Sequence, residues 1–169
     1  TNLFSAFEKE TQIVFGDTQR AELLSSMARI ASEQLKDDER SVALWRQVLD
    51  IRGEDLEALN AIGTIYERQK NWRDLADILE REATEARAQG QDAMAISAYS
   101  DLARLWYGKL ENSASALESW EKVLEVDPQH VEALEAICEI HRRANEWSDV
   151  TMTLHRIVDG CAERTHWLE

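Results

Sequence analysis

The chain has 169 residues, with 33 acidic and 19 basic side chains and a formal net charge of −14. Because affinity for phosphate backbones is largely electrostatic, this charge argues against a nucleic-acid partner. No apolar run approaches the ~18 residues of a membrane span, which argues against membrane insertion, and one Pro with six Gly leaves few tight turns for β-hairpins. Two cysteines make no disulfide scaffold and favour a reducing, cytoplasmic setting.

Apolar residues recur every three or four positions along the chain, as in Leu56, Leu59, Ile62 and Ile65. This period predicts helices rather than strands, and the abundant Ala, Leu, Glu, Arg and Gln favour helix. Short polar breaks separate the periodic segments, and such short connections make consecutive helices antiparallel neighbours. In chain order, the nine predicted helices are 3–14, 19–36, 39–51, 55–69, 72–88, 92–110, 113–126, 130–144 and 147–160.

The sequence repeats itself when it is shifted by 75 positions. Trp45 and the Val-Leu pair after it then align with Trp120 and its Val-Leu pair, and Trp72 aligns with Trp147, all without a gap. Matched tryptophans in one register indicate two copies of a four-helix unit. Residues 3–15 match the second helix of a further unit, so we expect the chain to be a fragment of a longer array.

Each half of the 75-residue unit carries a pattern of small and bulky positions. Leu59, Ile62-Gly63 and Tyr66 occupy the first helix of one copy, and Ala116, Trp120 and Pro128 follow in the second half of the next. This pattern resembles the tetratricopeptide repeat (TPR) family, in which Trp, Leu-Gly, Tyr, Ala, a bulky residue and Pro stand at these places. The period-75 double unit also resembles long bacterial repeat proteins.

The resemblance implies an all-α fold, a right-handed α-solenoid of antiparallel helix pairs. We expect one TPR-like domain over 1–169, made of about four repeats and a leading half repeat. The expected boundaries are 3–15 for the half repeat and 19–54, 55–91, 92–129 and 130–161 for the repeats. Trp167 and the C-terminal tail lie outside this pattern.

Small residues recur at one place in the four first helices, which lets a partner helix approach closely. These residues are Ala28, Gly63, Ala103 and Cys138. Bulky aromatic residues recur on the opposing surfaces, and we expect them to pack in the core; stacking against a ligand is the alternative. They are Trp45, Trp72, Trp106, Trp120 and Trp147.

Candidate catalytic and metal-binding groups are sparse. Cys138 and His141 lie one helical turn apart, and His155 and Cys161 would complete four zinc ligands on paper. Their spacing matches no established zinc pattern, however, and the first two occupy packing positions of the repeat. Without a phosphate loop or a hydrolase motif in the sequence either, we expect no enzyme activity, no metal and no cofactor.

The resemblance implies that the first helix of each pair lines a concave, ligand-binding face. Arg29 aligns with Arg104, and Arg68 with Arg143, so arginines repeat along this face and suit bidentate contacts to an acidic or C-terminal peptide. Local pairing of Arg29 with Glu33, and of Arg143 with Glu139, is the alternative. The candidate binding residues are Arg29, Asn60, Thr64, Arg68, Ser100, Arg104, Tyr107, Glu139 and Arg143.

The carboxylate-clamp pattern of chaperone-binding members is absent, because Ser25 and Arg29 stand where that pattern has Lys and Asn. The expected function is therefore a non-catalytic scaffold that binds some other peptide or protein surface through the concave groove. The alternative is a structural spacer or assembly element within a long array. In that case the apolar N-terminal segment would mediate end-to-end self-association.

Overall fold

A computed structural model of the chain describes residues 16–166, with side chains as far as residue 158. The predicted helix at 3–14 and Trp167 lie outside the described residues. The eight other predicted helices all form, and no strand occurs in the described range. They are α2 (Asp17–Ile30) with a π-helical turn η1 (Ala31–Leu35), α3 (Asp38–Arg52), α4 (Leu56–Gln69), α5 (Trp72–Ala88), α6 (Asp92–Gly108), α7 (Ser113–Val126), α8 (Val131–Ala144) and α9 (Trp147–His166).

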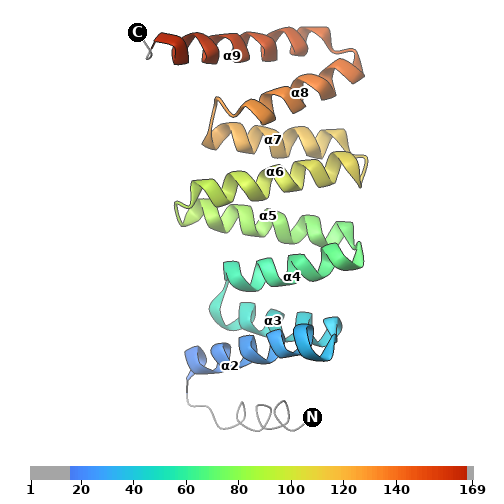
Figure 1. Cartoon of the computed structure of the whole chain (residues 1–169), viewed down its shortest axis with the longest axis vertical. Helices are drawn as coiled ribbons and strands as arrows, with labels where there is room; N and C mark the ends of the chain where they lie inside the picture. Colours follow the sequence, from blue (N-terminus) through green and yellow to red (C-terminus); the bar gives the residue numbers. More distant parts are fainter. Residues whose placement is uncertain (1–15, 167–169) are drawn as a thin grey trace. The chain divides into compact units, whose positions relative to one another are not determined.

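The chain divides into two compact units, unit 1 (Thr1–Glu85) and unit 2 (Ala86–Glu169). Unit 1 contains α2, α3, α4 and most of α5, and unit 2 contains α6 to α9. Within each unit, consecutive helices run antiparallel and lie in chain order (Figure 1). The 75-residue offset aligns α2 to α5 with α6 to α9, so these two sets of helices are the two copies of the sequence repeat, although the last residues of α5 belong to unit 2. No helix of the described chain is long and apolar enough to cross a bilayer.

Side-chain caps fix where the inner helices of each unit begin. Asp37 accepts a hydrogen bond from the Arg40 N–H at 3.0 Å, and at the same place in unit 2 Asn112 accepts one from the Ser115 N–H at 3.1 Å. Asp55 caps α4, and its counterpart His130 caps α8 through Nδ1. Such caps satisfy amide groups that the helix itself leaves without partners.

Two turn geometries account for the different helix spacing within odd and even repeats. In the odd repeats, the N–H of Asp37 donates to the Ala31 carbonyl and that of Asn112 to the Trp106 carbonyl, six residues back. In the even repeats, Asn71 and Glu146 donate five residues back, as in a Schellman motif. The wider turn accommodates the one extra residue that separates the helices of the odd repeats.

A small residue brings α4 close to α5, as the repeat pattern predicts. A Cβ atom added at Gly63 would lie 3.4 Å from Ile78 Cγ2 and 3.6 Å from Leu75 Cδ1. Alanine would fit at contact distance, whereas a longer side chain would force the helices apart. Trp45 and Trp120 are only 2% and 3% exposed, and each fills the interior of its own unit.

The prediction that all five repeat tryptophans lie in the core is wrong for one of them. Trp72 and Trp106 are half-buried, but Trp147 is 60% exposed. Trp147 opens α9, whose main neighbour among the described elements is α8. The described residues therefore leave much of the Trp147 indole exposed.

Candidate functional site

The predicted binding residues lie on the first helices of the pairs. In unit 1 these are α2 and α4, and in unit 2 they are α6 and α8. We call their exposed side chains the first-helix face of each unit. On unit 1 this face carries Arg29, Asn60, Thr64 and Arg68; on unit 2 it carries Arg104, Tyr107, Glu139 and Arg143.

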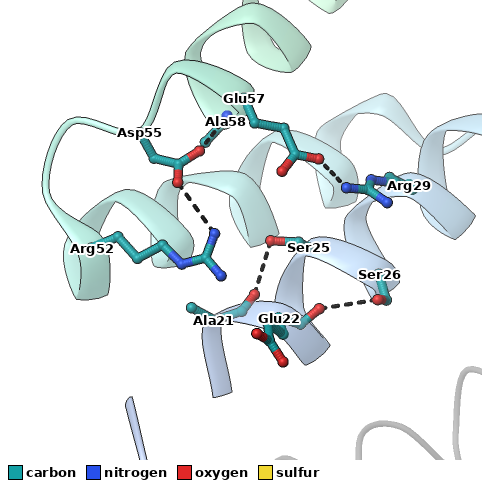
Figure 2. A network of polar contacts seen from close by, with 9 residues as sticks. All are labelled: Ala21, Glu22, Ser25, Ser26, Arg29, Arg52, Asp55, Glu57 and Ala58. Atoms are coloured by element: carbon teal, nitrogen blue, oxygen red, sulfur yellow. Dashed lines mark hydrogen bonds and ion pairs between the residues drawn. The ribbon is translucent and has the colours of Figure 1, made fainter. Parts of the chain in front are cut away.

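An ion pair joins the two first helices of each unit. Arg29 of α2 contacts Glu57 at the start of α4 (Figure 2). Arg104 of α6 contacts Glu132 of α8 in the same way and also contacts Asp101 at 2.7 Å. All of these side chains are about half exposed. Arg29 thus pairs with a residue of another helix, and not with Glu33 one turn away on its own helix as the local-pairing alternative predicts.

The second matched pair of arginines has different surroundings in the two units. In unit 1, Arg68 contacts Asp38, which begins α3. The 75-residue offset places Ser113 at the position of that aspartate, so Arg143 has no equivalent partner there. Arg143 contacts Glu139 on its own helix at 2.6 Å instead, as the local-pairing alternative predicts.

Arg143 also lies over an aromatic ring. Its guanidinium carbon is 5.6 Å from the centre of the Tyr107 ring, a cation–π distance. Unit 1 has Ser32 at the position of that tyrosine. Unit 2 therefore offers an exposed arginine next to a half-buried aromatic ring, a combination that the matching positions of unit 1 lack.

Hydrogen bonds stabilise the charged forms of two groups on the first-helix face of unit 2, Glu139 and Arg104. Hydrogen bonds from Arg142 and Arg143 lower the pKa of the Glu139 carboxyl, and a hydrogen bond to Glu132 raises the pKa of Arg104. When folding lowers the pKa of a carboxyl, its ionised form stabilises the folded state at a pH above the pKa that the group has in the unfolded chain. This stabilisation is lost as the pH falls through the pKa that the group has in the folded chain. The Glu139 carboxylate and the Arg104 guanidinium are therefore charged near neutral pH.

Two predicted residues, Ser100 and Thr64, offer less to a ligand than the sequence suggests. Ser100 is only 3% exposed, so it lies under the face and not on it, because its helix turns that position toward its neighbours. Its Oγ has no hydrogen-bond partner among the described residues. Thr64 is exposed, but its hydroxyl donates to the Asn60 carbonyl at 3.0 Å, while the Asn60 side chain points to solvent.

Among the described residues, no group of potential metal ligands joins Cys138, His141 and His155, three of the four residues considered as zinc ligands. The His155 ring bonds to the Thr151 carbonyl of its own helix at 2.9 Å, and the side chain of Cys161 lies outside the described ones. His141 turns instead toward two carboxylates at the α8–α9 turn, Glu146 and Asp149. The sequence motif did not include these two carboxylates, although the 75-residue alignment marks one of them as a departure from the repeat.

Neither models of known protein families nor the sequences of curated proteins match this chain. Solved structures do match its fold. The N-terminal domain of stress-induced protein-1 from C. elegans is 15% identical, with a TM-score of 0.60, over 76% of this chain and 99% of that one. A crystal structure of MamA is 14% identical, with a TM-score of 0.57, over 96% of this chain and 89% of that one. BtubC from P. vanneervenii is 11% identical, with a TM-score of 0.51, over 97% and 75% of the two chains.

These likenesses concern the fold, since identities this low carry no statement about ligands. The all-α, TPR-like solenoid class of fold that the sequence predicts is confirmed.

Proposed function

We propose that the chain is a non-catalytic docking scaffold that binds an acidic peptide, or the carboxyl terminus of a protein, on its first-helix faces. The observation that carries this proposal is the repetition of arginines at matched positions of the two units. The guanidinium group of arginine is planar and can donate two parallel hydrogen bonds to one carboxylate. Arginines at these positions would therefore let an otherwise acidic protein bind an acidic ligand.

The ion pairs of these arginines are compatible with ligand binding. Arg29, Arg104 and Arg143 are all about half exposed or more, and solvent screens an exposed ion pair so that it contributes little to stability. A peptide carboxylate can therefore replace the intramolecular partner at little cost. The intramolecular carboxylates also hold the guanidinium groups in place before the ligand arrives, which reduces the ordering cost of binding.

Unit 2 is the stronger candidate for the first contact. Arg143 lies over Tyr107, and the ring offers an apolar surface for a side chain next to the bound carboxylate. Arg104 is held one helix away by Glu132 and Asp101. Two cations and one ring suit a short acidic segment that also carries an apolar side chain.

A peptide titration tests this function. The probe is a fluorescent Asp/Glu-rich peptide with a free C-terminal carboxylate, and the test variant is Arg104→Glu/Arg143→Glu. We expect the affinity to fall at least about tenfold, or ~1.4 kcal/mol, because both cations become anions.

The matched control is Arg156→Glu, which changes an equally exposed arginine that pairs with Glu121 across α7 and α9. It should bind the peptide almost as well as the unchanged chain. Equal affinity of all three proteins for the peptide would refute the first-helix face of unit 2 as the binding site.

We also propose an alternative function in assembly, which one feature of α9 favours. Trp147, Leu154 and Val158 are 60%, 48% and 62% exposed and follow one another at helical spacing along α9. The matching positions of α5 are better covered, and Ala83 there is fully buried. An apolar helix face of this kind suits a second copy of the chain, which would bury it by helix-on-helix packing.

Light scattering over a range of protein concentrations checks the alternative. We expect the unchanged chain to form dimers as its concentration rises and Trp147→Glu/Leu154→Glu to stay monomeric, because the charges disrupt the apolar face. A chain that is monomeric at every concentration would eliminate α9 as an assembly surface.

A further inference from the structure

The α8–α9 turn gathers three side chains that are common metal ligands. His141 lies in the last turn of α8, Glu146 directly precedes α9, and Asp149 lies in the first turn of α9. Asn145, with a φ of 61°, reverses the chain between the helices. One potential ligand atom from each side chain lies within 4.8 Å of the other two, and His141 Nδ1 is 2.6 Å from Glu146 Oε2.

We propose that His141, Glu146 and Asp149 form a binding site for one divalent transition-metal ion. An imidazole nitrogen and two carboxylate oxygens are ligands that Zn²⁺ accepts at 2.0–2.2 Å, and three protein ligands leave room for water in the remaining positions. The histidine side chain is only 18% exposed, which fixes the direction of its ring, whereas Glu146 is 52% exposed and can adjust to an ion.

Unit 1 provides an internal comparison, because the same turn occurs there without the ligands. The 75-residue offset places Tyr66 at the position of His141 and Asn71 at that of Glu146, and only the aspartate is kept, as Asp74. Both turns have the same backbone hydrogen bond, from Asn71 to Tyr66 and from Glu146 to His141, at 2.9 and 3.0 Å. Two substitutions in an unchanged backbone frame therefore separate a turn with one ligand from a turn with three.

The two turns also differ in the partners of the aspartate carboxylate, and this difference likewise favours a cation at the turn of unit 2. In unit 1, the Asn71 amide donates a hydrogen bond to the Asp74 carboxylate, which satisfies that carboxylate locally. In unit 2, a glutamate replaces the donor, and within the described chain no hydrogen bond or ion pair reaches the Asp149 carboxylate. Two carboxylates close together repel one another, and a bound cation would relieve this repulsion.

Calorimetric titration with Zn²⁺ tests the site on the full, untagged chain. We expect the unchanged chain to bind one Zn²⁺ per chain at this turn. The variant His141→Tyr/Glu146→Asn carries the residues of unit 1, which fit this backbone, and should lose at least about tenfold in Zn²⁺ affinity, since changes outside the ligand set already cost that much. Circular dichroism melts check that the variant stays folded.

The reciprocal variant, Tyr66→His/Asn71→Glu, should gain a second Zn²⁺ per chain, because Asp74 already supplies the third ligand. Its stability should fall somewhat, since Arg46 donates a hydrogen bond to the Tyr66 hydroxyl at 2.8 Å and would lose this partner. Titration below its melting temperature keeps the gain measurable.

Co²⁺ substitution separates this site from one that uses a cysteine. The proposed ligands are nitrogen and oxygen, so the spectrum should lack a sulfur-to-cobalt charge-transfer band. That band would show that a cysteine is a ligand and would overturn the assignment. Equal Zn²⁺ binding by the unchanged chain and His141→Tyr/Glu146→Asn, or no binding by the unchanged chain, would overturn it as well.

Discussion

Replacement of Trp45 by alanine is expected to lower the free energy of unfolding by ~3–5 kcal/mol. Trp45 lies in α3, between α2 and α4, and is 2% exposed, so its truncation removes a large apolar surface and leaves a cavity that the helices fill only in part. Its counterpart Trp120 is 3% exposed in α7 and should behave alike. Denaturant unfolding followed by circular dichroism measures the loss.

Trp147→Ala is the matched control for this experiment. It removes the same atoms from the start of a repeat helix, but the indole is 60% exposed, so we expect a loss below about 1 kcal/mol. Similar losses for Trp45→Ala and Trp147→Ala would contradict the burial described here. They would indicate that α9 is covered in solution, as the assembly alternative requires.

Replacement of Ile137 by alanine is expected to cost ~2–5 kcal/mol, because this side chain is 1% exposed in the middle of α8. Repeat folds are stabilised by contacts between neighbouring helices, so a loss of stability at one helix need not affect distant helices equally. Amide hydrogen exchange should therefore rise most in α6 to α9 and least in α2 and α3.

Ile62→Ala is the reciprocal variant, since Ile62 occupies the matching position in α4 and is fully buried. It should accelerate exchange most in unit 1. If either substitution accelerated exchange uniformly along the chain, the two units would unfold as one cooperative body, and the division of the core into two parts would be wrong.

Much of the fold follows from periodicity and self-comparison. The three-to-four spacing of apolar residues predicts the helices, and the 75-residue offset predicts which positions are equivalent. Gly63 shows why this works: a small residue facing a neighbouring helix has the same packing role wherever the repeat recurs. Helix ends are also predictable where an aspartate such as Asp55 stands one residue before the apolar pattern.

The candidate site is less predictable from the sequence, because its contacts depend on which helices lie next to each other and on how far the side chains extend between them. The contact between Arg29 and Glu57 spans 28 positions of the sequence, and intra-helix spacing pointed to Glu33 instead. Glu57 and Glu132 are matched by the 75-residue offset, and this match is the signal in the sequence that would have predicted the contact. Trp147 shows the other limit, since equivalence in the repeat does not say whether a further helix covers the position.

Hydrogen-exchange footprinting shows where an acidic ligand binds, and we expect it to bind on the first-helix faces. Exchange would be compared with and without the Asp/Glu-rich peptide, with the matching Asn/Gln-rich, C-terminally amidated peptide as the control ligand. We expect the acidic peptide to slow exchange in α6 and α8, around Arg104 and Arg143, more than in α7 and α9. Protection confined to α7 and α9, or equal protection by both peptides, would contradict it.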